Sequence, residues 1–313
     1  MKKCMGCMRD YSDTYRVCPV CGYSESLSKS VMREIPDAIR PETILGGRFI
    51  IGKVLSDTPF AYVYISWDAL LQRRVIIKEY FPERYASRIE GESGIRFQSP
   101  HEQMLFEKGR TVFEAETKTL NANQDLQGIV HVYRCLNENN TSYMVMEYLE
   151  GMSLQDYMDW EEPFPIQTEE IFRQLTEIVE QVHTRGFAHH NLSPDNIYLE
   201  ENGKIRLLDF GNAKREVYQL SGRPMPIYRE CFIAPEILEQ KDAGFSADLY
   251  SLGAICYFLE TGKEPPTQAN RRGRKRFTTG IPEKDRMIHF LMEPQPKERP
   301  ENIAQFRKVY QRI

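Results

Sequence analysis

The sequence predicts an α+β fold with a β-rich first lobe, a helical second lobe and a small cysteine-rich segment before them. Runs of β-branched and aromatic residues recur in the first half of the chain and indicate strands. Apolar residues at helical spacing recur in the second half. Two Cys-x-x-Cys pairs lie within the first 21 residues. A sheet-rich lobe followed by a helical lobe is typical of a two-lobed architecture with a cleft.

Residues 1–23 are predicted to form a zinc ribbon, because Cys4 and Cys7 are followed by a second pair, Cys18 and Cys21. Each pair can hold one edge of a metal tetrahedron from a tight turn, and four thiolates without a nearby histidine favour structural zinc. So short a segment cannot build its own core, so the metal would supply its folding free energy. A redox-active pair and a rubredoxin-like iron site are the alternatives.

Residues 24–43 are polar, contain two prolines and lack periodicity, so we expect a linker. The compact domain is expected at 44–313, with its first lobe at about 44–150. The expected elements of this lobe are strands at Arg48–Leu55, Ala61–Trp67, Arg74–Tyr80, Val130–Leu136 and Ser142–Tyr148, and a helix at Leu105–Asn121.

The second lobe, about 151–313, is predicted to be helical. Ile171, Leu175 and Val182 share one helical face, and the run ends at Gly186. The segment Asp248 to Leu259 is apolar nearly all round, which indicates a helix buried in the core. A final amphipathic helix is expected from Ile303 onward.

Composition excludes several classes of protein. Lys plus Arg number 41 and Asp plus Glu 45, and the formal charge of −4 argues against a general nucleic-acid or membrane-surface binder. No apolar run approaches the ~20 residues of a membrane span, and the first residues do not resemble a signal peptide. We therefore expect a cytoplasmic protein. The basic run 271–276 is either a solvated loop or a docking patch for an acidic partner or RNA.

Seven short motifs occur in order between residues 44 and 313. They are Val75–Pro82 with Lys78, Phe113–Leu120 with Glu116, Met146-Glu147-Tyr148, His189–Asn196, Asp209-Phe210-Gly211, Ala234-Pro235-Glu236, and Asp248 with Arg299. In this order and spacing the set resembles the protein kinase fold, and most closely the bacterial serine/threonine kinases.

The resemblance implies a role for each retained nucleotide-site residue. Lys78 would neutralise the α- and β-phosphates of ATP and be held by Glu116, while Asn196 and Asp209 would hold magnesium. Met146 and Tyr148 would belong to the hinge beside the nucleotide base. Two structural roles follow as well: a buried ion pair between Glu236 and Arg299, and an apolar column of Leu120, Phe210 and His189.

The catalytic loop departs from the family pattern. Asn191 stands where the family has the aspartate that accepts the substrate proton, and a carboxamide cannot act as a general base at neutral pH. Ser193 replaces the lysine that steadies the transferring phosphate. Tyr228-Arg229 replaces the Gly-Thr that joins these groups, and His190 replaces the arginine that would pair with an activating phosphate. The joint loss predicts impaired phosphoryl transfer.

The nucleotide site is also altered. The phosphate loop, Ser56–Ala61, lacks all three expected glycines, Asp57 adds a negative charge and Pro59 removes a backbone donor. Ile76 and Tyr198 are larger than the residues expected on either side of adenine. The surviving polar residues therefore have two interpretations, either nucleotide binding or an internal polar network.

The sequence as a whole predicts a pseudokinase that acts as a binding or regulatory scaffold for a protein partner. Two enzymatic alternatives remain. One is a weakly active serine/threonine kinase that uses Asp195 as an unusual base, and the other is a nucleotidyl transferase on the same fold.

Overall fold

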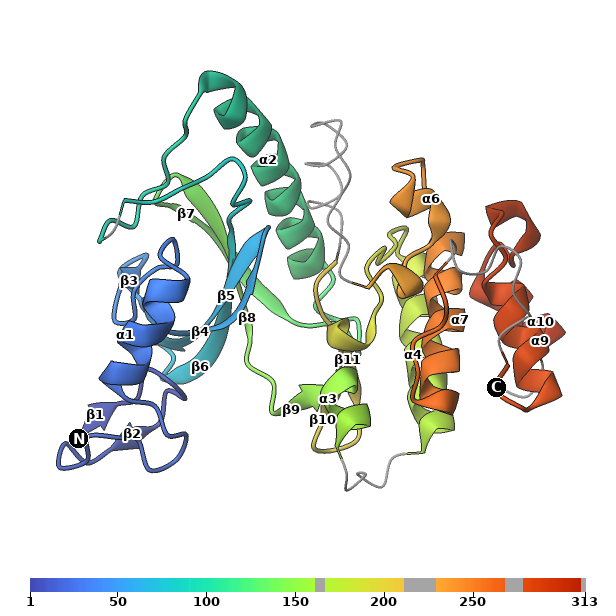
Figure 1. Cartoon of the computed structure of the whole chain (residues 1–313), viewed down its shortest axis with the longest axis horizontal. Helices are drawn as coiled ribbons and strands as arrows, with labels where there is room; N and C mark the ends of the chain where they lie inside the picture. The colour runs from blue at the N-terminus through green and yellow to red at the C-terminus, as the bar shows by residue number, and fades with distance from the viewer. Residues whose placement is uncertain (90, 161–166, 211–228, 268–277, 311–313) are drawn as a thin grey trace. The chain divides into compact units, whose positions relative to one another are not determined.

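The structure is a computed structural model that describes residues 1–89, 91–160, 167–210, 229–267 and 278–310. The chain divides into two compact units (Figure 1). The first contains Met1–Gln124 and His131–Tyr148, and the second contains Asp125–Val130 and Leu149–Ile313. The α+β class and the division into a β-rich and a helical part are confirmed.

The first unit is built on a six-stranded antiparallel sheet of order β3-β4-β5-β6-β8-β7. Its strands are β3 (Ile44–Leu45), β4 (Phe49–Thr58), β5 (Ala61–Asp68), β6 (Arg73–Tyr80), β7 (Val132–Glu138) and β8 (Thr141–Glu147). Helix α2 (Pro100–Ala122) packs against β7 and β8. Ser99 begins this helix by accepting a hydrogen bond from Glu102 N at 3.2 Å, and Pro100 occupies the first turn.

The segment 24–43 differs from the expected linker. It contains helix α1 (Glu25–Glu34), which starts at the N-cap Ser24. After the helix, Ala38 and Ile39 are buried, and Ile39 N donates to the hydroxyl of Tyr64 at 3.0 Å. The hydrogen bond to Tyr64 joins one backbone group to a distant residue of the sheet, and apolar periodicity does not reveal such a contact.

A buried polar cluster completes the attachment of this segment to β6. Tyr64 donates to the carboxylate of Glu79 at 2.8 Å, and Arg88 pairs with the same carboxylate. Arg88 N also donates to the Asp37 carboxylate at 2.6 Å. Glu79 and the Arg88 side chain are almost fully buried, so their charges compensate each other away from water. The segment is therefore tied to the strand that carries Lys78.

The second unit is mainly helical. Its elements are β9 (Gly151–Ser153), α3 (Leu154–Asp159), α4 (Thr168–Thr184), η1 (Pro194–Asn196), β10 (Ile197–Glu200), β11 (Ile205–Leu207), η2 (Glu230–Phe232), α6 (Pro235–Leu238), α7 (Ser246–Thr261), α9 (Pro282–Leu291), η3 (Pro296–Glu298) and α10 (Ile303–Val309). The strands form a small antiparallel sheet of order β11-β10-β9.

Helix α7 is the core of the second unit and packs against α4 and α9. Nearly all of its side chains are buried, as the apolar sequence predicts, and it ends at Gly262 with a φ of +66°. On α10, Ile303 and Phe306 are buried but Val309 is 58% exposed. The apolar face of that helix is thus shorter than its spacing suggests. Across the described residues, the helices are all too short or too polar to span a membrane.

Candidate functional site

The expected catalytic loop brings four predicted residues together in the second unit. The side-chain amide of Asn191 donates to the carbonyl oxygen of Asp209 at 2.9 Å and to its carboxylate at 3.2 Å. Asn196 donates in turn to the carbonyl oxygen of Asn191 at 2.8 Å. Ser193 is buried, and its carbonyl accepts from Asn196 N at 3.0 Å. At Asn191 the site therefore presents a donor to Asp209 rather than a proton acceptor.

His189 is fully buried beneath this loop. The centre of its ring lies 4.2 Å from that of Phe210, with the ring planes inclined by 35°, so two members of the expected apolar column are in contact. Nδ1 accepts from Asn191 N at 3.2 Å, and Nε2 donates to Leu208 O at 2.9 Å, which requires the neutral tautomer. Burial lowers the pKa of His189 to about 4, in agreement with a neutral ring. Leu120 is buried in the first unit.

Asp248 holds the start of the catalytic loop. It accepts hydrogen bonds from His189 N at 2.8 Å, His190 N at 2.7 Å and His183 Nε2 at 2.8 Å. Burial opposes its charge, but the bond from His183 and the nearby histidines lower its pKa overall. His190 adopts a φ of +59°, so Asp248 stabilises a turn that a non-glycine residue seldom forms.

Asp195, the alternative base, is bound to an arginine. Arg229 donates to its carboxylate from Nε at 2.9 Å and from Nη2 at 3.2 Å. The same guanidinium pairs with Glu264. Arg229 stands where the family has threonine, and it links two carboxylates instead. Proton acceptance by Asp195 would have to compete with this ion pair.

The first unit carries the other nucleotide-site residues. Lys78 lies on β6 and Glu116 on α2, and both are buried. The ammonium of Lys78 lies 6.0 Å from the centre of the Phe113 ring. Met146 lies on β8 and is half-buried, and Arg74 stacks over the Tyr148 ring at 4.2 Å.

The expected phosphate loop is a tight hairpin turn. Thr58 pairs directly with Ala61, so only Pro59 and Phe60 connect β4 to β5. The hydroxyl of Thr58 accepts from Ala61 N at 3.1 Å and donates to Ala61 O at 3.1 Å. Phe60 is buried against Tyr80, with the two rings edge to face at 5.2 Å. The tip of the hairpin is therefore packed onto the end of β6.

Backbone bonds hold the same tip. Phe81 N donates to Phe60 O at 2.9 Å, and Glu83 N donates to Pro59 O at 3.0 Å. A phosphate-binding loop needs free N–H groups and the freedom to close. Here the side chain of Phe60 packs on Tyr80 at the end of the Lys78 strand. The carbonyl oxygens of the turn accept hydrogen bonds from residues that follow this strand.

The two large residues of the expected adenine slot lie on different strands. Ile76 pairs with Ile65 and Met146 in the six-stranded sheet. Tyr198 lies on β10, and its hydroxyl donates to Gly151 O at 2.8 Å. This bond fixes the tyrosine ring against the segment that follows the hinge.

The ion pair between Glu236 and Arg299 is as expected from the sequence. Two parallel bonds of 2.7 Å and 2.8 Å join the guanidinium to the carboxylate, and both side chains are buried. Arg299 also donates to Glu293 O at 2.6 Å and to Ser246 O at 3.0 Å. The pair thus joins α6 to the start of α7 and to the chain after α9.

The four N-terminal cysteines converge on one point in the first unit. Their sulfur atoms all lie within 4.8 Å of one another. The Cys4 and Cys21 sulfurs are 3.5 Å apart, and those of Cys7 and Cys18 are 3.9 Å apart. A tetrahedral zinc with Zn–S bonds of ~2.3 Å would set these separations at about 3.8 Å. Gly6 N donates to the Cys4 sulfur at 3.3 Å. The donor set therefore fits a metal ion.

Comparison with known proteins decides the family. A protein kinase domain model matches residues 99–309. The chain belongs to the protein kinase family. It is 28% identical over 227 residues to the probable serine/threonine-protein kinase pknA2 of Bifidobacterium longum, a match that covers 72% of this chain and 28% of that protein. It is 26% identical over 223 residues to the serine/threonine-protein kinase PrkC of Bacillus subtilis, covering 71% and 31% respectively. The chain thus spans less than a third of the length of these relatives.

Solved kinase structures share the fold. The apo form of PpkA-294 superposes with a TM-score of 0.73 at 24% identity, covering 87% of this chain and 99% of that one. The kinase domain of PknI from Mycobacterium tuberculosis, solved as a double mutant, gives a TM-score of 0.64 at 16% identity, covering 88% and 98%. The likeness therefore extends beyond residues 99–309 to most of the β-rich unit.

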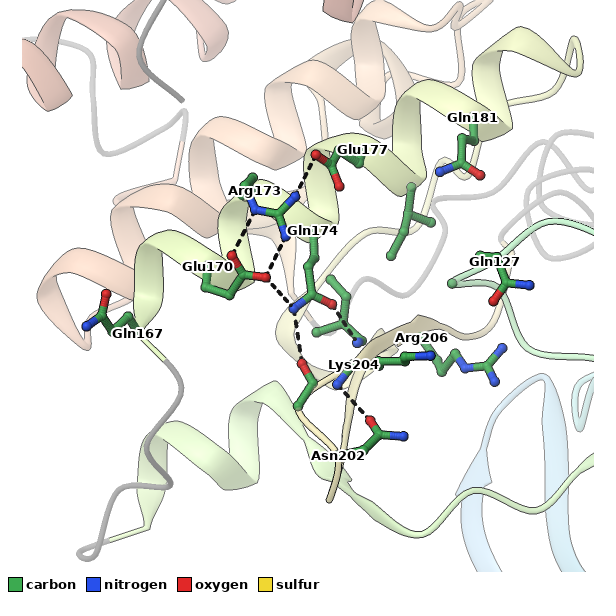
Figure 2. Close-up of a pocket in the computed structure, with 14 residues that line it drawn as sticks. Gln127, Gln167, Glu170, Arg173, Gln174, Glu177, Gln181, Asn202, Lys204 and Arg206 are labelled. Atoms are coloured by element: carbon green, nitrogen blue, oxygen red, sulfur yellow. Dashed lines mark hydrogen bonds and ion pairs between the residues drawn. The ribbon is translucent and has the colours of Figure 1, made fainter.

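A polar groove in the second unit of this kinase-family chain lies between α4, the β10–β11 turn and Gln127 (Figure 2). Arg173 bridges Glu170 and Glu177 along α4 (Figure 2). Gln174 donates to Gly203 O at 3.0 Å and so fixes the turn between the strands. The Arg173 ion pairs therefore stabilise α4 itself, and the Gln174 contact positions the β10–β11 turn.

Two features of this kinase fold were not predicted from the sequence. One is the packing of Phe60 onto Tyr80, for which the only sequence signal is an aromatic residue between two strands. The other is the ion pair of Arg229 with Asp195, two residues 34 positions apart. Gly211, Tyr228 and the basic run 271–276 lie outside the described residues.

Proposed function

We propose that this chain is a pseudokinase: a kinase fold that binds and regulates a protein partner, with phosphoryl transfer impaired or absent. The observation that carries the proposal is the amide of Asn191, which donates to the carboxylate of Asp209. The position where kinases place a proton acceptor is thus occupied by a donor that is already bonded.

The chemistry of phosphoryl transfer explains the weight of this contact. A kinase base orients the substrate hydroxyl and accepts its proton. The amide of Asn191 has no usable proton affinity at neutral pH. Ser193 cannot replace a lysine as a positive charge beside the transferring phosphate. Substrate orientation and charge stabilisation are therefore both weakened.

The hairpin between β4 and β5 supports the same proposal. The packing of the Phe60 side chain on Tyr80 holds its tip in place. The carbonyl oxygens of Pro59 and Phe60 also accept hydrogen bonds from residues that follow β6. Closing such a tip over phosphates would first require breaking these contacts. Nucleotide, if it binds with magnesium through Lys78 and Asp209, would lack the usual backbone cradle.

The cysteine cluster is proposed to hold structural zinc. Four thiolates that fill a tetrahedron leave no open position for substrate, so the metal would stabilise the fold of residues 1–23 rather than react. Iron in the same tetrahedron is the alternative occupant. Elemental analysis of purified protein should give one zinc per chain.

Two active alternatives come from the family. The relatives are named as serine/threonine kinases, and a weak kinase could use Asp195 as its base. That carboxylate would first have to leave Arg229. A nucleotidyl transferase on the same fold would instead bind ATP in the reverse direction and transfer its α-phosphate with the attached nucleoside.

Two labelling experiments separate the three functions. The protein and a generic protein substrate are incubated with magnesium and with ATP labelled at either the α-phosphate or the γ-phosphate. A pseudokinase transfers neither label above background. Transfer of the γ-label identifies a kinase, and transfer of the α-label identifies a nucleotidyl transferase. Asp209→Ala is the matched control, since true activity should vanish in that variant. Label transfer lost with Asp209→Ala would overturn the proposal.

A regulatory role further requires a protein partner whose binding does not depend on chemistry. We expect an identified partner to bind the parent and Asp209→Ala with the same affinity. A partner that binds only the parent in the presence of magnesium and ATP would favour an active kinase instead.

A further inference from the structure

Strand β4 contains a bulge at the point where the cysteine segment touches it. Two of its residues, Gly52 and Lys53, together face the single residue Ile65 of β5. A bulge interrupts the ladder and leaves a backbone group without its usual partner. Here Lys53 N donates to the carbonyl oxygen of Met5 at 2.7 Å. The cysteine segment therefore supplies the bond that the neighbouring strand does not.

Gly52 allows this close approach. A Cβ atom at this position would overlap the Cε of Met8 and the carbonyl oxygen of Met5, and it would lie 2.8 Å from Ile65 O. Met8 itself is 1% exposed, so its side chain is buried over the bare backbone of the bulge. The bulge and the first cysteine turn are therefore complementary in two ways. Lys53 N donates to Met5 O, and the side chain of Met8 fills the space left by the missing side chain of Gly52.

A second contact reaches β5. The ammonium of Lys3 lies 3.6 Å from the centre of the Trp67 ring, within the range of a cation–π interaction. The same ammonium pairs with Asp10 at 2.9 Å, across the two-stranded sheet of β1 (Lys2–Lys3) and β2 (Asp10–Tyr11). The cysteine segment thus contacts both strands of the β4–β5 hairpin.

Both contacting methionines belong to the turn that presents the first two cysteines. Met5 lies between Cys4 and Cys7, and Met8 follows directly. Met8 N donates to Cys4 O at 2.8 Å, and Met8 adopts a φ of +55°, which is unfavourable for a residue with a side chain. This turn needs an external constraint, and a metal bound by its two cysteines would supply one.

We propose that the cysteine ribbon is a metal-dependent brace for the β4–β5 hairpin. With metal bound, Met5 and Met8 are held against Gly52 and Lys53 and the base of the hairpin is ordered. When the metal is lost, the turn relaxes and the bulge loses its bond. The order of the β4–β5 hairpin, which faces nucleotide in the kinase family, would thereby depend on metal binding by the cysteines. This inference rests on the zinc site proposed above.

The test uses the whole chain of residues 1–313 and four variants of it. Cys4→Ser with Cys18→Ser removes ligands from both cysteine turns. Met8→Ala keeps all four ligands but removes the side chain that covers Gly52. Met104→Ala is the matched control, because Met104 is 44% exposed on α2. Trp160→Phe leaves Trp67 as the only tryptophan, since the chain has two.

Three quantities are measured: zinc per chain, hydrogen exchange in residues 50–58 and in β8, and Trp67 emission before and after chelation. We expect the parent and Met104→Ala to bind one zinc and to protect residues 50–58. The double cysteine variant should lose zinc and exchange these amides at least about tenfold faster. Met8→Ala should retain zinc yet also exchange faster. Chelation should change Trp67 emission as Lys3 leaves the ring.

The outcomes separate the brace from the zinc site. If zinc binds and is lost in the double variant while exchange of residues 50–58 and Trp67 emission stay unchanged, the brace is wrong and the zinc site stands. If the parent binds no metal, both are wrong. If exchange rises equally in β8, the metal stabilises the whole unit and the hairpin has no special coupling, which also overturns the brace.

Discussion

The side-chain amide of Asn191 lies 3.2 Å from the carboxylate of Asp209 and donates a hydrogen bond to it. The residue at the catalytic-base position thus stabilises the negative charge of the Asp209 carboxylate through a hydrogen bond. The contact links the loss of the base to the stability of the site, because an aspartate at position 191 would replace attraction by repulsion.

Asn191→Asp should therefore destabilise the protein in the absence of magnesium, and it should not create an active kinase. Two carboxylates at this distance repel each other, which should lower the free energy of unfolding by on the order of 1 kcal/mol. Magnesium should stabilise the variant more than the parent. Thermal melts with and without magnesium measure both effects, and Asn202→Asp in an exposed turn is the control.

Phosphoryl transfer by Asn191→Asp should stay at background, because Ser193 and the fixed hairpin are unchanged. Turnover comparable to that of an ordinary kinase from this single substitution would show that the hairpin closes over nucleotide. The interpretation of the β4–β5 turn would then be wrong.

Phe60→Ala should be strongly destabilising although Phe60 lies in a two-residue turn. Its side chain is 6% exposed and packs on Tyr80. Truncating a buried phenylalanine costs about 3–5 kcal/mol. Leu55→Ala, on the same hairpin but 45% exposed, should cost far less. Urea unfolding measures the free energy of unfolding of both variants. Equally small losses would mean that the tip of the hairpin is not packed against β6.

Nucleotide should bind weakly and depend on Lys78. A ligand that binds only the folded state stabilises it by RT ln(1 + [L]/Kd), about 2.7 kcal/mol at a hundredfold excess. We expect the melting temperature to respond only to millimolar ATP with magnesium. Ile76→Ala should strengthen the response by enlarging the adenine slot, and Lys78→Ala should abolish it.

Lys108→Ala is the control for the lysine substitution, because Lys108 is exposed on α2. Absence of any response in the parent and in Ile76→Ala would assign the surviving polar residues to an internal network. A micromolar response of the parent would show that the hairpin is no obstacle.

Arg299→Ala should be among the most damaging substitutions in the second unit. It leaves the carboxylate of Glu236 buried without its bidentate partner. Breaking a buried pair in this way costs about 3–5 kcal/mol. Arg173→Ala removes an exposed arginine from the Glu170 and Glu177 pairs on α4 and should have a much smaller effect. Similar losses for both variants would contradict the assigned burial.

Stability should fall on acidification because of His189. Burial lowers its pKa to about 4, whereas the ring in the unfolded chain has a pKa near 6.5. Below pH 6.5 the unfolded state binds a proton that the folded state does not. The free energy of unfolding therefore decreases between pH 6.5 and 4, by about 3 kcal/mol in total. Denaturant unfolding across this range measures the slope.

His189→Gln should flatten that slope, because the variant has no imidazole to protonate. His101→Gln, at an exposed position on α2, is the matched control. A slope that His189→Gln leaves unchanged would assign the acid sensitivity to other groups, such as the buried carboxyl of Asp248.

The sequence by itself determined the fold class, the order of the kinase motifs and the clustering of four cysteines. These features depend on local patterns: alternation for strands, helical spacing for α4 and α7, and close Cys-x-x-Cys pairs. The ion pair of Glu236 with Arg299 was also predictable, because the family resemblance assigns both residues.

Only the tertiary structure decided how Asn191, Phe60 and Met5 are used. Asn191 bonds Asp209, Phe60 packs on Tyr80, and Met5 accepts from Lys53 across 48 residues of chain. None of these contacts has a periodic signal, because each joins one backbone or side-chain group to a distant one. The anchors of residues 24–43 lack a periodic signal for the same reason. Asp37 accepts a hydrogen bond from Arg88 N, and Ile39 N donates to the Tyr64 hydroxyl, so each binds a single distant group and the two form no apolar stripe.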